Sequence, residues 1–419
     1  MTVIALAATR RRVPLAAGIC LLSFTAFWAA QRAADVSMID LMVYRAEGET
    51  VRAGGDLYAL RTTKAHLPTT YPPFAALLFT PLTLLDTAAM RTLATLGNLL
   101  LLVVFVHLSL RLIHGGQGGR GERGEPGKRH ARVESALWAS ALAVWCEPVW
   151  TTLRYGQINL LLAVLVLWDL SRRPGHRWAG AGIGVAAAIK LTPALFAALL
   201  MFTGAAEALR RGPWRPAVRQ ACLAAASFAG ATLLAAAALP YDSWRFWTRM
   251  VFEAGRVGFA EDTANQSLRG VLARLLHTGE PGARWVLAAA VAGALGLAVA
   301  VTAALRGERA WAALACAATA LLVSPVSWSH HWVWCVPMVL LLAAEAERRG
   351  GPARWAVAGA SSLVFCSYAL WWVPHGPHGA GRLELAQDYG QMTLSALYVV
   401  TAFAFLLVAV TRSRTSRTA

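Results

Sequence analysis

Charged residues are scarce in this chain, and so are long polar stretches. Only 15% of its 419 residues are Asp, Glu, Lys or Arg, whereas 57% are hydrophobic, and the mean hydropathy is +0.50. No polar region is large enough for a soluble domain, which excludes a water-soluble protein of this length. A helix needs about 20 apolar residues to cross roughly 30 Å of hydrocarbon, and such stretches recur from end to end. The composition predicts an all-α, polytopic integral membrane protein with a single transmembrane domain over residues 1–419.

Metal motifs and paired cysteines are also missing. The six cysteines fall inside apolar stretches at spacings that suit neither a metal site nor a disulfide ladder, so we expect small core residues at Cys20, Cys146, Cys222, Cys316, Cys335 and Cys366. The sequence has no Asp-x-Asp pair of the kind used with nucleotide sugars. We therefore predict neither a metal nor a cofactor.

Acidic residues are outnumbered, 22 against 39 basic ones, which gives a net charge of +17. The basic residues lie in short segments between apolar runs, without aromatic interleaving, and this pattern argues against nucleic acid as a partner. Under the positive-inside rule they indicate cytoplasmic segments instead. The N-terminal arginines could belong to a cleaved signal, but no convincing cleavage site follows, so we expect an uncleaved first span. The predicted cytoplasmic segments are 10–12, 111–132 with the basic loop 114–132, 172–177, 210–219, 306–309, 348–354 and the tail 412–419.

The apolar stretches predict about twelve spans, some of them broken or re-entrant, with both termini in the cytoplasm. Residues 178–203 lie between two basic segments, so they must go out and return, and we expect a break at Lys190 to Pro193. We interpret 71–85 as a short or re-entrant helix from the outer face. The predicted spans are 13–31, 88–113, 133–150, 156–171, 178–190, 192–203, 217–239, 283–305, 310–323, 331–346, 355–373 and 391–411.

This topology places most of the unusual residues outside the cytoplasm, in the first extracytoplasmic loop 32–70, in the loop 240–282 and at the outer helix ends. Asp40 follows the first apolar stretch by ten residues and could act as a general base just outside the lipid. A helix N-cap is an equally good interpretation of Asp40 from spacing alone. Lys190 is the only lysine inside an apolar stretch, which favours phosphate binding, with snorkelling to the interface as the alternative.

Further cationic side chains could contact the same substrate. Arg154 and Arg269 stand beside amide-rich outer loops and could hold a phosphate in bidentate fashion, although solvated loop arginines are commoner. His330 and His331 follow a Ser-Pro turn and could hydrogen-bond a sugar or a phosphate. Adjacent histidines do not converge on one ion, so a metal site is not expected there. One base with nearby cations suffices for glycosyl transfer from a lipid phosphate, because phosphate leaves as a stable anion.

Seven motifs together resemble the polyprenol-phosphate-mannose-dependent α-1,2-mannosyltransferases of glycosyltransferase family 87, a branch of the integral-membrane GT-C fold. They occur in the family's order and cover most of the chain. The motifs are Asp40-Leu-Met-Val-Tyr44, Gly54-Gly55-Asp56-Leu57-Tyr58, Thr70-Tyr-Pro-Pro-Phe74, Gly156-Gln-Ile-Asn159, Ala188-Ile-Lys-Leu-Thr-Pro193, Asn265-Gln-Ser267 and Ser324-Pro-Val-Ser-Trp-Ser-His330.

The resemblance implies a polyprenyl-phosphate mannose donor presented from the outer leaflet and an inverting transfer to a cell-envelope glycolipid or glycan. Asp40 would be the general base, while Lys190 and His330 would hold or neutralise the donor phosphate. Tyr44 and Asn265 would line the sugar pocket, and the turn from Tyr71 to Pro73 would shape its wall.

Two other classes of function stay open at this point. An outer cavity with an intramembrane lysine and broken helices could also belong to a transporter or a flippase, which internal repeats would favour, and none are visible. A catalytically inactive scaffold for envelope-glycan assembly would keep the same pocket. Neither the acceptor nor the oligomeric state is readable from the outer loops.

Overall fold

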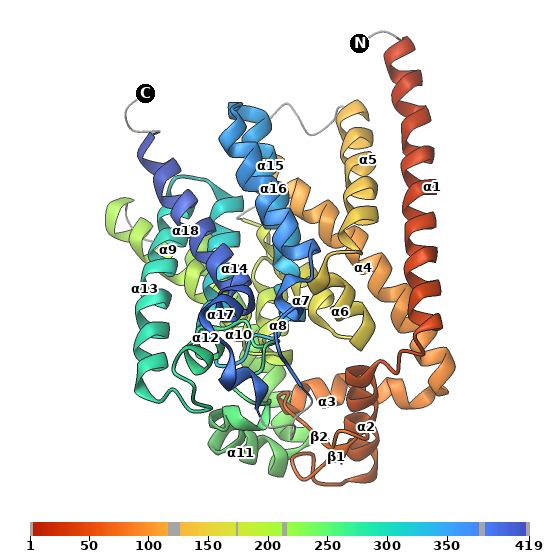
Figure 1. Cartoon of the computed structure of the whole chain (residues 1–419), viewed down its shortest axis with the longest axis vertical. Helices are drawn as coiled ribbons and strands as arrows, with labels where there is room; N and C mark the ends of the chain where they lie inside the picture. The colour runs from red at the N-terminus through yellow and green to blue at the C-terminus, as the bar shows by residue number, and fades with distance from the viewer. Residues whose placement is uncertain (1–2, 116–125, 173–174, 212–215, 377–381, 416–419) are drawn as a thin grey trace.

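The computed structural model describes residues 3–115, 126–172, 175–211, 216–376 and 382–415. Most of its long helices run roughly along the vertical axis of Figure 1, between an upper and a lower end of the molecule. Both chain termini lie at the upper end of that view, and a layer of short helices with one small hairpin lies at the lower end. The fold within the described ranges is helical, as the sequence predicts, and its only strands are two of two residues each, Arg61–Thr62 (β1) paired antiparallel with Leu67–Pro68 (β2).

The α-helices are Val3–Ala33 (α1), Ile39–Ala53 (α2), Pro73–Phe79 (α3), Thr87–Gly115 (α4), Pro126–Ala143 (α5), Glu147–Tyr155 (α6), Asn159–Leu170 (α7), Ala181–Ile189 (α8), Ala194–Arg211 (α9), Pro216–Ala238 (α10), Pro240–Thr248 (α11), Leu268–Leu275 (α12), Ala283–Leu305 (α13), Arg309–Val323 (α14), Cys335–Arg349 (α15), Pro352–Cys366 (α16), Tyr389–Ser395 (α17) and Leu397–Thr415 (α18). Short 3-10 helices are Thr80–Leu84 (η1), Met250–Phe252 (η3), Ala254–Arg256 (η4), Ser329–Trp334 (η5), Ala369–Trp371 (η6) and Leu383–Ala386 (η7).

Membrane-spanning helices are present, but the structure does not confirm about twelve of them. By length and composition, four described helices could cross a membrane, and the number rises to six if two bent helix pairs each count as one span. The remaining apolar helices are shorter, among them the segment Pro73–Leu84 that we interpret as re-entrant. The chain is thus a multi-pass membrane protein whose interior contains several broken helices.

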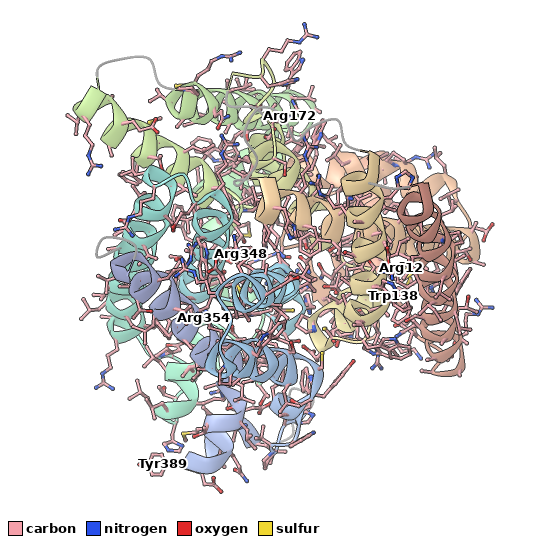
Figure 2. The ribbon with its side chains drawn as sticks, turned by 90° about the horizontal axis from the view of Figure 1, so that it is seen from above. Arg12, Trp138, Arg172, Arg348, Arg354 and Tyr389 are labelled. Atoms are coloured by element: carbon pink, nitrogen blue, oxygen red, sulfur yellow. The ribbon has the colours of Figure 1, made fainter. Side chains whose placement is uncertain are left out.

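Arginines near the C-terminal end of α15 and in α18 lie at the end of the molecule that carries both chain termini. Figure 2 looks down onto this end and labels Arg12 of α1, Arg348 of α15, Arg354 of α16 and Arg172, which follows the end of α7. There the buried carboxylate of Glu345 binds Arg348, Arg349 at 2.9 Å and Arg412 at 3.0 Å. This cluster ties the end of α15 to the last helix, α18. The predicted loop 114–132 lies largely outside the described residues, as does the end of the 412–419 tail.

Two sequence-based expectations are wrong in this part of the fold. The predicted span 133–150 crosses a helix break, because α5 ends at Ala143 and α6 starts at Glu147 with Pro148 in its first turn. Proline fits the first turn of a helix but not its interior, so a new helix begins there. The cysteines are not uniformly core residues either, since Cys222 and Cys366 are exposed on the protein surface.

Three breaks in the helices shape the functional site. α6 and α7 meet at an angle of 117°, and α17 and α18 at 64°. The predicted break at Lys190 is present, because Lys190 has an extended backbone, with φ −150° and ψ 128°, between α8 and α9. Each break frees backbone groups and aims polar side chains into the protein rather than toward lipid.

Candidate active site

Asp40 lies in the first turn of α2, directly after the connection from α1. The N-cap of this helix is Met38, whose backbone is left-handed (φ 52°), and no side chain caps the helix. The N-cap interpretation of Asp40 is therefore wrong, and its carboxylate is available for other contacts. The residue is half-buried at the junction of α2 with the α6–α7 elbow.

Gln157 is the hydrogen-bond partner of the Asp40 carboxylate. Its Oε1 atom accepts hydrogen bonds from the hydroxyls of Tyr44 at 2.9 Å and Tyr71 at 3.2 Å. With its oxygen used in this way, the amide nitrogen of Gln157 is left to donate to Asp40. The two tyrosine hydroxyls are also 2.9 Å apart, and Tyr44 stacks on Phe79 at 4.3 Å between ring centroids. Asp40 therefore sits in a fixed hydrogen-bond network.

Gly156 allows this network to form. It ends α6 with a left-handed backbone (φ +68°), and a Cβ atom there would lie 2.7 Å from the Cβ of Leu41. Any other residue would meet both a steric clash and an unfavourable backbone conformation. The close contact brings the start of α2 against the α6–α7 elbow, which carries Gln157 beside Asp40.

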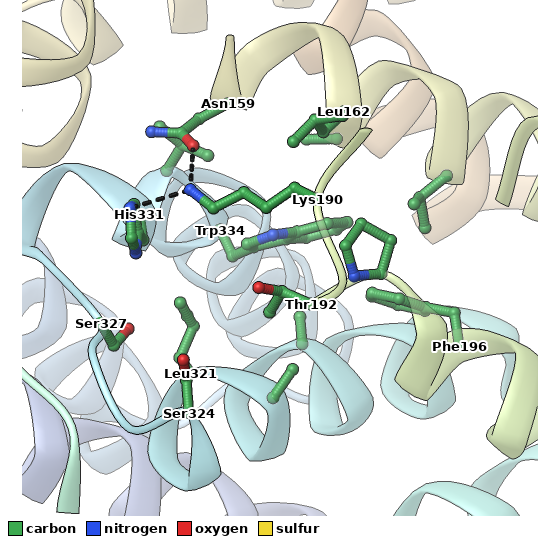
Figure 3. Close-up of a pocket in the computed structure, with 16 residues that line it drawn as sticks. Asn159, Leu162, Lys190, Thr192, Phe196, Leu321, Ser324, Ser327, His331 and Trp334 are labelled. Atoms are coloured by element: carbon green, nitrogen blue, oxygen red, sulfur yellow. Dashed lines mark hydrogen bonds between the residues drawn. The ribbon is translucent and has the colours of Figure 1, made fainter. Parts of the chain in front are cut away.

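Lys190 belongs to a second polar cluster, which Tyr71 separates from the Asp40 network. Its ammonium group donates to Asn159 Oδ1 at 3.3 Å and contacts Nε2 of His331 at 2.9 Å, as Figure 3 shows. Because an ammonium can only donate, the imidazole Nε2 must accept, which leaves the ring proton on Nδ1. The Lys190 nitrogen also lies 5.5 Å from the centre of the Tyr71 ring. Tyr71 thus connects the Asp40 network to the Lys190 group.

A cavity opens beside Lys190, with about 540 Å³ of space not filled by protein atoms. One wall is polar and the other apolar (Figure 3). Its polar lining is Asn159, Lys190, Thr192, Ser324, Ser327 and His331, and its apolar lining includes Leu162, Phe196, Leu321 and Trp334. A cation on a wall of mixed character suits an anionic head group attached to an apolar chain.

Hydrogen bonds from residues of α6 and α7 fix the segment that carries His330 and His331. The backbone oxygen of His330 accepts hydrogen bonds from Thr152 Oγ1 at 2.6 Å and Asn159 Nδ2 at 2.9 Å. Ser329 donates to the buried Glu147 carboxylate at 2.8 Å. The His330 ring is buried against Tyr155, and its Nε2 atom has no hydrogen-bond partner. Of the two, His331 contacts Lys190 and lines the cavity, and the choice of the imidazole that acts stays a prediction.

Two carboxyl groups of α2 have different protonation states. Burial raises the pKa of Asp40 to about 6, against the lowering effects of the Gln157 hydrogen bond and the Lys190 charge. Burial raises the pKa of the fully buried Glu47 to about 8, although a bond from Thr69 opposes the shift. At neutral pH, Asp40 is ionised and Glu47 is neutral. Asp40 is therefore the carboxylate that can accept a proton here.

The model of glycosyltransferase family 87 matches residues 70–325. The chain belongs to glycosyltransferase family 87. The match includes Gln157, Asn159 and Lys190, whereas Asp40 and His331 lie outside it. Membership makes the chain a glycosyltransferase and favours an enzyme over a transporter or a scaffold.

Curated relatives of this family 87 enzyme carry specific names. The chain is 36% identical, over 74% of its length and 71% of the relative, to a polyprenol-phosphate-mannose-dependent alpha-(1-2)-phosphatidylinositol mannoside mannosyltransferase of Mycobacterium tuberculosis. A phosphatidylinositol pentamannoside mannosyltransferase of the same kind from that species is 34% identical, over 75% of this chain and 68% of the relative. Among solved structures, ArnT from Cupriavidus metallidurans bound to undecaprenyl phosphate aligns with 95% of this chain and 76% of its own, at 13% identity and a TM-score of 0.40.

The structure brings together Asp40, Tyr44, Tyr71, Lys190 and His331 of this family 87 glycosyltransferase, but not the other residues expected at the site. Asn265 is fully buried, and both ends of its amide bind backbone, at Ala260 and Ser327. It binds the backbone of Ser327, a lining residue, and is not itself among the residues that line this cavity, so its expected contact with the sugar stays a prediction. Arg269 packs over Trp285 at 5.8 Å, and Arg154 is exposed on α6, so neither lines the cavity.

Gln157 and Asn159 contact the candidate site residues, although the sequence analysis assigned them no individual role. Both belong to the Gly156-Gln-Ile-Asn159 motif, so their place was visible. Their contacts with Tyr44, Lys190 and His330 join residues 31 to 171 positions apart. The only signal was an amide pair between two apolar runs, which is also typical of a simple turn.

Proposed function

We propose that this glycosyltransferase transfers mannose from polyprenyl-phosphate mannose to a hydroxyl group of a cell-envelope glycolipid. The transfer would invert the anomeric centre and form an α-1,2 linkage on the extracytoplasmic face. The observation that carries the proposal is that one carboxylate, Asp40, and one ammonium, Lys190, are linked through Gln157 and Tyr71, near enough for the Lys190 charge to lower the pKa of Asp40. Lys190 lines the cavity. The names of the mycobacterial relatives support mannose as the sugar and a phosphatidylinositol mannoside as the first acceptor to test.

The chemistry needs both charges. Asp40 accepts the proton of the acceptor hydroxyl while its oxygen attacks the anomeric carbon of mannose. The bond between that carbon and the phosphate oxygen breaks, and the electron pair stays on the phosphate. Lys190, with His331 and Asn159 beside it, receives the charge that develops on the leaving group. Because phosphate needs no proton to leave, a second acid is unnecessary, and Glu47 can remain buried and neutral.

The position of the site supports the extracytoplasmic face. α2 and the β1–β2 hairpin lie at the end opposite the two chain termini (Figure 1). The basic residues that indicate the cytoplasm gather at the other end, around Glu345 and Arg412. A donor anchored in the outer leaflet would reach the cavity laterally, its lipid chain along the apolar wall and its phosphate toward Lys190.

The test is mannose transfer by the purified full-length protein in lipid vesicles. Radiolabelled polyprenyl-phosphate mannose is the donor, and a panel of phosphatidylinositol mannosides supplies acceptors. We expect Asp40→Asn to lower the rate by about 10²–10⁴-fold, because a positioned general base contributes that much. Asp35→Asn is the matched control, since Asp35 is exposed five residues earlier in the same connection and should transfer at the wild-type rate.

Equal rates for the Asp40→Asn and wild-type proteins would refute the role of Asp40. If neither protein transfers mannose to any acceptor, but vesicles containing wild-type protein move the labelled donor across the bilayer, the flippase interpretation would replace the proposal. Linkage analysis of the product then checks the α-1,2 bond, because a β-linked product would contradict the inverting displacement.

A further inference from the structure

Cys146 and Cys366 touch at the side of the bundle, although 220 positions separate them in the sequence. Their Sγ atoms are 3.1 Å apart. Cys146 is the N-cap of α6 and is half-buried, and Cys366 is the last residue of α16 and is exposed. A disulfide needs a sulfur separation of about 2.0 Å, so a small rotation about the side-chain bonds would bring the atoms to bonding distance.

Two more contacts hold the same pair of segments together. The backbone oxygen of Trp145 accepts a hydrogen bond from the Tyr368 hydroxyl at 3.3 Å. The carboxylate of Glu147 accepts one from Trp371 Nε1 at 3.2 Å. Three consecutive residues, 145 to 147, therefore each contact the segment 366–371. The approach of the sulfurs follows from how the backbones are packed and not from one flexible side chain.

Both cysteines stand at helix ends away from the basic segments. α5 begins within the predicted basic loop and runs 18 residues before the turn to Cys146, and α16 begins among Arg348, Arg349 and Arg354 and runs 15 residues to Cys366. At about 1.5 Å per residue these lengths place the pair more than 20 Å from the cytoplasmic ends. Trp145, Tyr368 and Trp371 surround the pair, and such aromatic side chains are enriched at membrane–water interfaces.

We propose that Cys146 and Cys366 form a structural disulfide in the membrane-inserted protein. The inference rests on the orientation in the proposed function, in which these helix ends point toward the oxidising side of the membrane and lie nearer to it than to the cytoplasm. Each thiol loses one proton and the pair loses two electrons as the sulfur–sulfur bond forms. The electron acceptor is the disulfide of an extracytoplasmic thiol oxidase, which is reduced to two thiols by exchange through a mixed disulfide at the exposed Cys366.

The bond would stabilise the support of the active site. Cys146 precedes Glu147, whose buried carboxylate binds Ser329 at 2.8 Å and Tyr398 at 2.8 Å. Ser329 starts the 3-10 helix that carries His331 to Lys190. A covalent link at Cys146 fixes the start of α6 against α16, and thereby the position of this carboxylate and of the histidine segment.

The experiment maps cysteine pairs in the wild-type full-length protein. Cells are treated with N-ethylmaleimide before lysis, and the protein is then purified, denatured without reductant, digested and analysed by mass spectrometry. We expect a linked peptide pair containing Cys146 and Cys366, two hydrogen masses lighter than the two thiol peptides. Cys222, which is exposed on α10, is the internal control and should carry the maleimide.

Maleimide on both Cys146 and Cys366 would overturn the proposal, and so would a link that appears only after an oxidant is added. Thermal denaturation is the second measurement. Reductant should lower the melting temperature of the wild type and of Cys222→Ser, but leave that of Cys366→Ser unchanged. These readouts do not depend on mannose transfer, so a free thiol pair in an active enzyme refutes the disulfide alone, and a linked pair in an inactive protein refutes the proposed function alone.

Discussion

Replacement of Gln157 by leucine tests how the site controls its base. The amide of Gln157 stabilises the ionised form of Asp40, whose pKa is about 6. A hydrogen bond to a charged group contributes roughly 1.5–3 kcal/mol, and one pKa unit corresponds to about 1.4 kcal/mol. Loss of the bond should therefore raise the pKa of Asp40 by about one to two units, to about 7–8.

The sign of the effect follows from the form that reacts. The base works as a carboxylate, so transfer should increase with pH through the pKa of Asp40 in both proteins. Near pH 6 about half of the wild-type carboxylate is ionised, against roughly 1–10% in Gln157→Leu, which predicts a rate about 5–50-fold lower. Above about pH 9 Asp40 is ionised in both the wild type and Gln157→Leu, and most of the difference between their transfer rates should disappear.

The assay is the initial rate of mannose transfer in vesicles, measured across this pH range at saturating donor. Tyr44→Phe is the matched control. It removes one of the two hydroxyls that donate to Gln157 Oε1 but leaves the hydrogen bond from Tyr71 at 3.2 Å, so Gln157 stays oriented. The pH at which the rate rises on the acidic side of the profile should therefore not change. A Gln157→Leu protein that is slower by the same factor at every pH would refute the reasoning, because Asp40 would then not be the group that titrates.

Three further predictions concern the neighbours of this base. Lys190→Met should lower kcat by about 10²–10³-fold, as expected when one group that stabilises developing charge is lost. It should also raise the pKa seen in the acidic limb of the pH profile, because the ammonium lowers the pKa of Asp40. An unchanged kcat would contradict the assignment of Lys190. Glu47→Gln should leave the pH profile unchanged up to about pH 7, because most of Glu47 is neutral that far below its pKa of about 8. A limb shifted to lower pH would show that Glu47 carries charge. Gly156→Ala should lower both the melting temperature and the transfer rate. The new Cβ would lie 2.7 Å from Leu41 Cβ, and the backbone φ of +68° adds a strain of about 1–3 kcal/mol. A normal melting temperature by circular dichroism would contradict this prediction.

The sequence identified the charged members of the site because charges are costly in an apolar chain. Lys190 stands out as the only lysine inside an apolar stretch, whereas Asp40, which has other carboxylates nearby, stands out by its position after the first apolar stretch. The break at Lys190 was readable from topology, since residues 178–203 must leave the cytoplasm and return. The structure confirms that break and shows that Tyr71 links the two groups. Family membership then supports the glycosyltransferase interpretation.

Other features depend on contacts between distant parts of the chain, which one sequence does not encode in a readable pattern. The family resemblance implied that Asn265 lines the sugar pocket, and the structure shows its amide bound to the backbone of its own loop and of Ser327. His330 and His331 are neighbours in sequence, and only the 3-10 turn decides which ring reaches Lys190. Pro148 lies in the first turn of α6 and indicates a helix start, but the apolar character of residues 133–150 as a whole led to the prediction of one continuous span.

The ammonium of Lys190 has a consequence for turnover. Its hydrogen-bond partners within the described residues are two neutral acceptors, Asn159 and His331. A donor phosphodiester would bring one negative charge to it, whereas the polyprenyl phosphate left after transfer is a monoester that carries nearly two at neutral pH. The cavity should therefore hold the spent carrier more tightly than the fresh donor. We expect carrier release, and not glycosidic bond formation, to limit the steady-state rate, so that accumulated carrier slows the enzyme by competing with its own donor.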